Sequence, residues 1–258
     1  MALNGDVVRV AAVGDVHCGK ASQGMLQPLF ARIAEAADVL VLCGDLTDYG
    51  LPDEAHVLVR EVTGVLKIPV VAVFGNHDFE SGHSDEVRTI LTDAGIRILD
   101  GDGVEIHGVG FAGVKGFAGG FGDRALQSWG EPVLKLFVRE AVEEALKLET
   151  ALARLRTPRR IAVLHYAPIQ ATVETEPAEI APFLGSSRLE EPINRYHATL
   201  VVHGHSHHGV PEGRTSTGVP VYNVSLPVLR DAFPERPPFR LFEIPAAAES
   251  PVAATAAS

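Results

Sequence analysis

Short apolar runs that alternate with helical patterns are the feature that most constrains how this chain folds. In its first half, the runs at residues 7–13, 39–43 and 70–74 are rich in Val, which is typical of buried strands. Helical patterns at 22–36 and 52–66 separate these runs. The order strand, helix, strand, helix, strand predicts parallel β-α-β units with right-handed crossovers.

The remainder of the chain continues the same alternation. Helices are expected at 84–94, 131–155 and 188–196, and strands at 96–99, 103–107, 109–113, 161–165, 200–203, 214–217, 219–224 and 239–244. The apolar stripe along 131–155 is expected to pack on the chain's own sheet, with a dimer face as the alternative. Residues 1–244 are expected to form one domain, and the Ala-rich stretch 245–258 a disordered tail.

Five polar clusters each follow a predicted strand. They are Gly14-Asp15-Val16-His17, Gly44-Asp45-Leu46-Thr47-Asp48, Gly75-Asn76-His77-Asp78, Leu164-His165-Tyr166 and Gly204-His205-Ser206-His207. Residues just past the carboxyl ends of parallel strands converge on one crevice of an open α/β sheet. We therefore expect the five clusters to meet in space.

The side chains of these clusters are suited to binding metals. The seven candidate ligands are Asp15, His17, Asp45, Asn76, His165, His205 and His207. Carboxylate and amide oxygens and neutral imidazoles bind divalent or trivalent first-row ions. One ion takes about four to six ligands including water, so seven protein groups predict two ions that share one ligand. A carboxylate is the natural shared ligand because it has two oxygens. We expect Mn and Fe, with Zn, Co or Ni as alternatives.

The order of the motifs resembles the calcineurin-like metallophosphoesterase superfamily. The series Asp-x-His, Gly-Asp-x-x-Asp, Gly-Asn-His-Asp, a lone His and Gly-His-x-His runs from Asp15 to His207, about three quarters of the chain. The resemblance implies an α/β fold, a four-layer αββα sandwich of two mixed β-sheets flanked by helices. It also implies a dinuclear metal site at the C-terminal ends of the strands and a phosphoester-hydrolysing activity.

The resemblance further implies a role for each motif residue. One metal would be held by Asp15, His17 and His207, the other by Asn76, His165 and His205, and Asp45 would bridge them. His77 would contact the phosphate and protonate the leaving oxygen, and Asp78 would orient His77. Two metals roughly 3.5–4 Å apart can hold a bridging water and provide hydroxide near neutral pH for in-line attack on the phosphorus.

Two departures from related motifs narrow the expected substrate. Protein Ser/Thr phosphatases continue the second motif into Asp-Arg-Gly, whereas this chain has Asp48-Tyr49-Gly50. The third motif ends in Asp78 rather than Glu, which resembles the small bacterial phosphodiesterase branch. We therefore expect a small phosphodiester, for example a cyclic nucleotide. The alternatives are a phosphomonoesterase acting on nucleotides or phosphoproteins, a non-catalytic binding scaffold and a nuclease.

Charge and composition limit the partners. The net charge of −11 argues against a nucleic acid polymer, because such ligands are bound largely through Lys and Arg. Two cysteines, Cys18 and Cys43, fit a reducing compartment. No apolar run is long enough to cross a bilayer, and the first residues lack a basic-then-apolar signal. We expect a cytoplasmic enzyme with a small phosphoester substrate and leave its oligomeric state open.

Several residues near the motifs keep two interpretations. Asp48 either supports a neighbouring motif side chain or begins a helix. His83 and His208 either contact substrate or are solvated loop residues, and Cys18 is not assigned as a ligand. The substrate pocket is expected to use the segments 79–84 and 115–130 and the residues after His165. The Gly-rich segment 115–130 has no clear period and is expected to form a long loop, which is often functional.

Overall fold

Two mixed β-sheets lie face to face between layers of helices in the computed structural model, which describes residues 7–245. The first sheet has the order β11-β1-β2-β3-β4. Its strands are β1 (Val7–Val13), β2 (Val39–Cys43), β3 (Val70–Val73), β4 (Ile96–Ile98) and β11 (Arg240–Pro245). Strands β1 to β4 are parallel, and β11 runs antiparallel to β1 at the edge.

The second sheet has the order β5-β6-β7-β8-β10-β9. Its strands are β5 (Asp102–Ile106), β6 (Val109–Gly113), β7 (Arg159–Val163), β8 (Leu200–His203), β9 (Glu212–Arg214) and β10 (Pro220–Asn223). The four central strands are parallel, and the edge strands β5 and β9 are antiparallel to their neighbours. The carboxyl ends of the parallel strands of both sheets therefore lie at one edge of the molecule.

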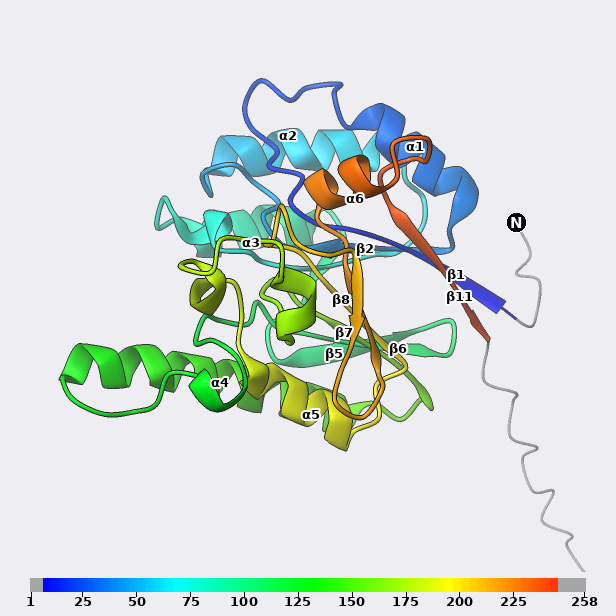
Figure 1. The fold of residues 1–258 in the computed structure, drawn as a ribbon. Coiled ribbons are helices and arrows are strands. Elements are labelled where there is room, and N and C mark those ends of the chain that lie inside the picture. Colours follow the sequence, from blue (N-terminus) through cyan, green and yellow to red (C-terminus); the bar gives the residue numbers. More distant parts are fainter. Residues whose placement is uncertain (1–6, 246–258) are drawn as a thin grey trace, which may run out of the picture.

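Helices cover both outer faces, as Figure 1 shows with α1 and α2 at the top and α4 and α5 at the bottom. The helices are α1 (Gln27–Ala36), α2 (Pro52–Thr63), α3 (Ser84–Asp93), α4 (Pro132–Arg154), α5 (Glu190–Arg195) and α6 (Leu226–Ala232). Short 3-10 helices are η1 (His77–Phe79), η2 (Gly122–Arg124), η3 (Gln170–Val173), η4 (Ala181–Phe183) and η5 (Ser187–Leu189). The predicted four-layer sandwich is confirmed.

One hydrophobic core joins the two sheets. Val41 and Val73 of the first sheet belong to the same buried cluster as Phe111 and Ile161 of the second. Every residue of β2 and β3 is buried, because one face meets the other sheet and the opposite face meets helices. This burial explains why the strands are continuous Val-rich runs without polar alternation.

The apolar stripe of α4 packs on the chain's own sheet, as predicted. Val138, Ala141, Leu148 and Leu152 are buried, and α4 contacts β5, β6 and β7. Val142, at the margin of the stripe, is 38% exposed. The dimer-face alternative is therefore not needed to explain the stripe.

The start of α1 differs from the sequence expectation. The helix begins at Gln27 rather than at residue 22. The carboxylate of Glu61, from α2, accepts hydrogen bonds from the backbone N–H groups of Gly24, Leu26 and Gln27. A side chain distant in sequence thus satisfies the free amides of this helix end, which local patterns do not reveal.

Other boundaries shift in the second half. Strand β7 ends at Val163, so His165 lies just past the strand rather than within it. Strand β9 covers Glu212–Arg214 instead of 214–217. The short helix α6 was not predicted, because its seven residues are too few to show a helical period.

The C-terminal boundary also shifts by one residue. Pro245, expected to begin the tail, ends β11 and pairs with Val7. The rest of the expected tail, 246–258, lies outside the described residues, and the single domain over 1–244 stays a prediction. Within residues 7–245, no helix combines the length and the hydropathy that a membrane crossing requires.

Candidate metal centre

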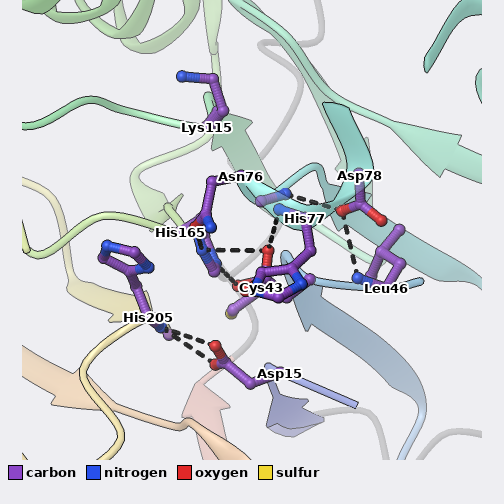
Figure 2. Close-up of polar contacts among 12 residues, drawn as sticks. Asp15, Cys43, Leu46, Asn76, His77, Asp78, Lys115, His165 and His205 are labelled. Atoms are coloured by element: carbon purple, nitrogen blue, oxygen red, sulfur yellow. Dashed lines mark hydrogen bonds and ion pairs between the residues drawn. The ribbon is translucent and has the colours of Figure 1, made fainter. Parts of the chain in front are cut away.

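The predicted ligands follow the ends of five parallel strands. Asp15 comes after β1, Asp45 after β2, Asn76 after β3, His165 after β7 and His205 after β8. Because parallel strands of both sheets end at the same edge, these side chains gather there. Figure 2 shows Asp15, His165, His205 and Asn76 converging on one region.

Four of the seven predicted ligands have a strained backbone. The φ angles of Asp15, His17, Asp45 and His205 are 57°, 41°, 46° and 69°. This left-handed region is sparsely populated by residues other than Gly, and such strain concentrates at functional sites. The chain therefore turns sharply just past β1, β2 and β8, and the strained residues are themselves candidate ligands.

Backbone amides hold the two carboxylates in place. The N–H of His77 donates to Asp45 Oδ1 at 2.9 Å, and the N–H of His205 donates to Asp15 Oδ1 at 3.0 Å. Glycines make room for these contacts. A Cβ atom on Gly75 would lie 2.1 Å from Asp45 Oδ1, and one on Gly204 would lie 2.3 Å from Asp15 Oδ2. The glycines of the motifs are therefore a steric requirement of the site.

Asp45 stands between two imidazoles, with one carboxylate oxygen toward each. Its Oδ2 lies 3.7 Å from His17 Nε2, and its Oδ1 lies 3.4 Å from His165 Nε2. The ligand atoms of Asp15, His17 and His207 lie within 4.8 Å of one another, and so do those of Asp45, His165 and His205. A third such group, His17, Asp45 and His77, shares one residue with each, so the candidate metal groups adjoin at Asp45.

The remaining contacts complete both groups. Asn76 Oδ1 lies 2.9 Å from His165 Nε2, which places the amide oxygen in the second group. His207 Nε2 lies 2.9 Å from Asp15 Oδ1 in the first. The structure therefore brings together all seven side chains that the sequence singled out.

Two imidazoles, those of His17 and His165, direct Nε2 toward the candidate ligand groups. The Nε2 atom of His17 is buried and has no hydrogen-bond partner among residues 7–245. Nδ1 of His165 lies 2.9 Å from the carbonyl oxygen of Cys43, which leaves Nε2 as the ligand atom. An orphaned buried nitrogen in a cluster of carboxylates and imidazoles fits first-row metal ions.

Burial also keeps two of these imidazoles neutral. Desolvation lowers the pKa of His17, although the carboxylates of Asp45 and Asp15 oppose the shift. Desolvation, reinforced by the neighbouring His165, lowers the pKa of His205 to about 3. A ligand imidazole must be neutral, so both rings are ready for a metal at neutral pH.

His77 lies at the rim of the site and is suited to holding a proton. Its ring centroid is 4.6 Å from that of His17, and its Nδ1 lies 2.7 Å from the carbonyl oxygen of Asp48. Desolvation lowers the pKa of His77, but this hydrogen bond and the charges of nearby carboxylates outweigh it and raise the pKa.

Within residues 7–245 the Asp78 carboxylate makes no hydrogen bond to the His77 ring, so its predicted orienting role would act through the backbone. This carboxylate is fully buried and accepts hydrogen bonds from the N–H groups of Leu46, Thr47 and Gly75 and from the Thr47 hydroxyl. Figure 2 shows the bond to Leu46. Asp78 therefore fixes the backbone that leads to Asp48, and the carbonyl of Asp48 holds the His77 ring.

The residues with two interpretations are now placed. Asp48 Oδ1 lies 3.7 Å from His17 Nδ1, which favours support of a motif side chain. His83 is exposed, and its ring and backbone N–H contact the Ser81 hydroxyl. His208 is also exposed, and its backbone N–H donates to Glu176 Oε1 at 2.8 Å. Cys18 is buried, and desolvation raises its pKa to about 12, so the thiol stays protonated and is a poor ligand.

Two side chains beside the centre lie in segments expected to form the pocket but were given no individual role. The ring of Tyr166 lies 4.3 Å from that of His205, and Lys115 Nζ lies 5.3 Å from the Tyr166 ring. The carbonyl oxygen of Lys115 also accepts a hydrogen bond from the His165 N–H at 3.0 Å. Lys115 comes two residues after β6, the kind of position that holds the metal-ligand candidates, and this position was the available signal.

Comparisons with known proteins identify one family and one fold. The model of a family described as calcineurin-like phosphoesterase matches residues 8–209. A search of curated protein sequences found no match.

Several solved structures share the fold. Phosphopantetheinyl hydrolase from Mycobacterium tuberculosis has a TM-score of 0.65 and 15% sequence identity, over 90% of this chain and 95% of that one. TT1561 of Thermus thermophilus has a TM-score of 0.52 and 15% identity, over 93% of this chain and 100% of that one. GAP50, described as the anchor in the inner membrane complex of Plasmodium, has a TM-score of 0.53 and 12% identity, over 87% of this chain and 73% of that one. At these identities the likeness is one of fold.

Proposed function

The chain belongs to the calcineurin-like phosphoesterase family of phosphoester-hydrolysing enzymes, and we propose that it hydrolyses a small phosphodiester with two bound metal ions. The position of Asp45 carries this proposal. One carboxylate oxygen faces His17 and the other faces His165, so a single side chain adjoins both candidate metal groups. A site for one isolated ion would not need this arrangement.

The chain's own side chains divide into two ligand sets. The first set is Asp15, His17 and His207; the second is Asn76, His165 and His205; Asp45 is shared. The nitrogen and oxygen donors favour Mn and Fe, with Zn, Co or Ni as alternatives. When bound, the metals would supply Lewis acidity to the phosphoryl oxygens and activate water near neutral pH.

His77 would give a proton to the leaving oxygen. The Asp48 carbonyl can only accept a hydrogen bond, so Nδ1 of His77 carries hydrogen and Nε2 remains for the substrate. The raised pKa of His77 increases the fraction of imidazolium, in which Nε2 also carries a proton. General acid catalysis of this kind is worth about 10²–10⁴ in rate.

Tyr49 supports a diester over a monoester. It occupies the position at which protein phosphatases carry a phosphate-binding Arg, and it is 53% exposed. A neutral residue there suits a diester with one negative charge better than a monoester dianion. A cyclic nucleotide is the first candidate substrate, and a nucleotide monoester or a phosphoprotein is the alternative.

A non-catalytic scaffold is the competing class, because the fold is shared with GAP50, a protein described as an anchor. Fold alone does not determine function. The seven assembled ligands and His77 favour catalysis. A nuclease is disfavoured by the net charge of −11. We place the enzyme in a reducing compartment, the cytoplasm, because Cys18 and Cys43 are free and buried.

The test compares four substrates for the Mn-loaded protein: bis-p-nitrophenyl phosphate, p-nitrophenyl phosphate, 2′,3′-cyclic AMP and 3′,5′-cyclic AMP. Asn76→Ala serves as the control that removes one ligand. We expect faster turnover of diesters than of the monoester, with loss of activity in the control. Faster turnover of p-nitrophenyl phosphate would favour the monoesterase, and no hydrolysis with two metals bound would favour the scaffold.

A further inference from the structure

Ser206 lies between two predicted metal ligands, and hydrogen bonds hold both its hydroxyl and its backbone carbonyl. It separates His205 from His207 and is fully buried. Its hydroxyl donates to Glu176 Oε1 at 3.0 Å. Its carbonyl oxygen accepts from Asn223 Nδ2 at 2.7 Å and from Ser225 Oγ at 3.1 Å. Both the side chain and the backbone of this residue are therefore fixed.

Glu176 is the charged member of this set. Its side chain comes from the segment between η3 and η4, and the residue is 8% exposed. The same Oε1 atom accepts from the backbone N–H of His208 at 2.8 Å. Within residues 7–245, Glu176 forms no ion pair with Lys, Arg or His. Burying a carboxylate that has only uncharged hydrogen-bond donors around it costs folding free energy. This cost indicates a specific role for Glu176.

The segment that carries Glu176 contacts the fifth motif along its length. Thr172 Oγ1 lies 2.9 Å from His203 Nε2, and the Thr172 carbonyl accepts from Val210 N at 3.1 Å. The carbonyl oxygen of Phe183 lies 3.3 Å from His205 Nε2. These bonds lie before, within and after the motif, so residues 172–183 form a support for the metal-binding loop.

The geometry of the loop makes such a support necessary. His205 has a φ of 69°, a conformation that persists only where the surroundings hold it. His205 belongs to one candidate metal group and His207 to the other. Because one short peptide supplies a ligand to each group, a shift of Ser206 would displace ligands of both.

We propose that Glu176 is a positioning residue, which acts through Ser206 to direct His205 and His207 toward the two metals. The proposal rests on the two-metal centre of the proposed function, but not on the identity of its substrate. Partners that orient metal ligands typically contribute 10- to 100-fold to metal affinity. Glu176 acts by accepting hydrogen bonds, so an uncharged acceptor at this position should preserve Mn²⁺ affinity.

The test measures Mn²⁺ affinity and stoichiometry of the full chain by isothermal titration calorimetry. We expect Glu176→Ala to weaken Mn²⁺ binding about 10- to 100-fold at both sites, and Glu176→Gln to stay within about threefold of the wild type. Glu179→Ala is the matched control, because Glu179 is an exposed carboxylate of the same segment. Far-UV circular dichroism establishes that each variant is folded.

Ser206→Ala keeps the proposal testable if Glu176→Ala does not fold. It removes the hydroxyl and should weaken Mn²⁺ binding in the same direction. In the double variant that combines Glu176→Ala with Ser206→Ala, the loss of Mn²⁺-binding free energy should be clearly smaller than the sum of the two single losses. Both substitutions remove the same hydrogen bond. Wild-type Mn²⁺ affinity in Glu176→Ala or in Ser206→Ala would overturn the proposal. Equal losses in Glu176→Gln and Glu176→Ala would also overturn it, because charge rather than hydrogen bonding would then be responsible.

These outcomes are separate from failure of the proposed function. A wild-type protein that binds two Mn²⁺ ions but hydrolyses no phosphoester would refute the function and leave the affinity test of Glu176 intact. A wild-type protein that binds no Mn²⁺ would overturn both.

Discussion

The Nδ1 atom of His77 lies 2.7 Å from the backbone carbonyl oxygen of Asp48. Asp48 is three residues past Asp45, whose carboxylate accepts a hydrogen bond from the His77 backbone N–H. The proposed acid and the proposed bridging ligand are thus fixed to each other through one loop. The orientation of the His77 ring therefore depends on backbone that Asp78 holds in place.

Replacement of His77 should affect substrates according to their leaving groups. His77→Ala should lower kcat about 10²- to 10⁴-fold for a diester with an alkoxide leaving group, which needs a proton to depart. The loss should be much smaller for bis-p-nitrophenyl phosphate, because p-nitrophenolate leaves without protonation. Steady-state kinetics on both substrates, at equal metal content, provide the measurement.

His83→Ala is the control for this prediction, because His83 is an exposed histidine six residues further along. It should leave kcat unchanged for both substrates. An equal loss for both leaving groups in His77→Ala would argue against the acid role.

Removal of the Asp78 carboxylate should destabilise the fold. Asp78→Ala leaves the buried N–H groups of Leu46, Thr47 and Gly75 without their acceptor, so we expect a loss of about 3 kcal/mol in the free energy of unfolding. Thr47→Val removes the hydroxyl that donates to Asp78 and accepts from the Gly50 N–H, and should cost about 2 kcal/mol. Urea titration of the metal-free proteins measures both. A change below about 1 kcal/mol in Asp78→Ala would contradict the network assigned to it.

Addition of one methyl group at Gly75 should disrupt the site. In Gly75→Ala the Cβ would lie 2.1 Å from Asp45 Oδ1 and 2.3 Å from Asp45 N, so Asp45 must move. We expect Mn²⁺ affinity to fall at least about 10-fold, as for loss of a ligand's support. Gly19→Ala is the control, because its Cβ would make only ordinary contacts, the nearest at 3.7 Å to Asp48 Oδ2. Unchanged affinity in Gly75→Ala would show that the clash is relieved without moving Asp45.

The convergence of the candidate metal ligands could be predicted from sequence because each motif follows an apolar strand. Parallel strand ends share one edge, so the order of the motifs was enough to bring Asp15, Asp45 and His205 together. The supporting contacts could not be predicted in the same way. Asp78 bonds to residues about thirty positions earlier in the chain, and Glu176 bonds to Ser206, 30 positions later. No local pattern specifies such pairs.

The same limit applied to the fold. The Val-rich strands were recognisable as continuous apolar runs, and the long helix α4 was recognisable because its apolar stripe repeats over many turns. The start of α1 was set by Glu61, 34 to 37 positions away, and α6 was too short to show a period. Sequence patterns therefore predicted which elements exist better than where those elements begin.

The ion pair of Arg9 and Asp38 should give a pH-dependent contribution to stability. Hydrogen bonding to the Arg9 guanidinium lowers the pKa of Asp38, and Asp38 accepts from Arg9 Nε, Nη2 and the backbone N–H. A carboxyl whose pKa is lowered in the folded state stabilises the fold above its unfolded pKa of about 3.9 and loses this contribution as pH falls through the folded pKa.

Asp38→Asn should therefore lower the free energy of unfolding by about 1 kcal/mol at pH 7 and by progressively less below about pH 4. Urea titrations of the metal-free wild type and variant across this range measure the difference. A difference that is constant from pH 7 to about pH 3 would show that the charge of Asp38 does not contribute.

We propose that two metal ions sharing Asp45 drive phosphodiester hydrolysis. The decisive experiment adds Mn²⁺ in known equivalents to the metal-free protein and follows hydrolysis of bis-p-nitrophenyl phosphate. We predict negligible activity without metal and a rise that ends at about two equivalents per chain, as a dinuclear site requires. A plateau at one equivalent, or no hydrolysis with two equivalents bound, would contradict the claim.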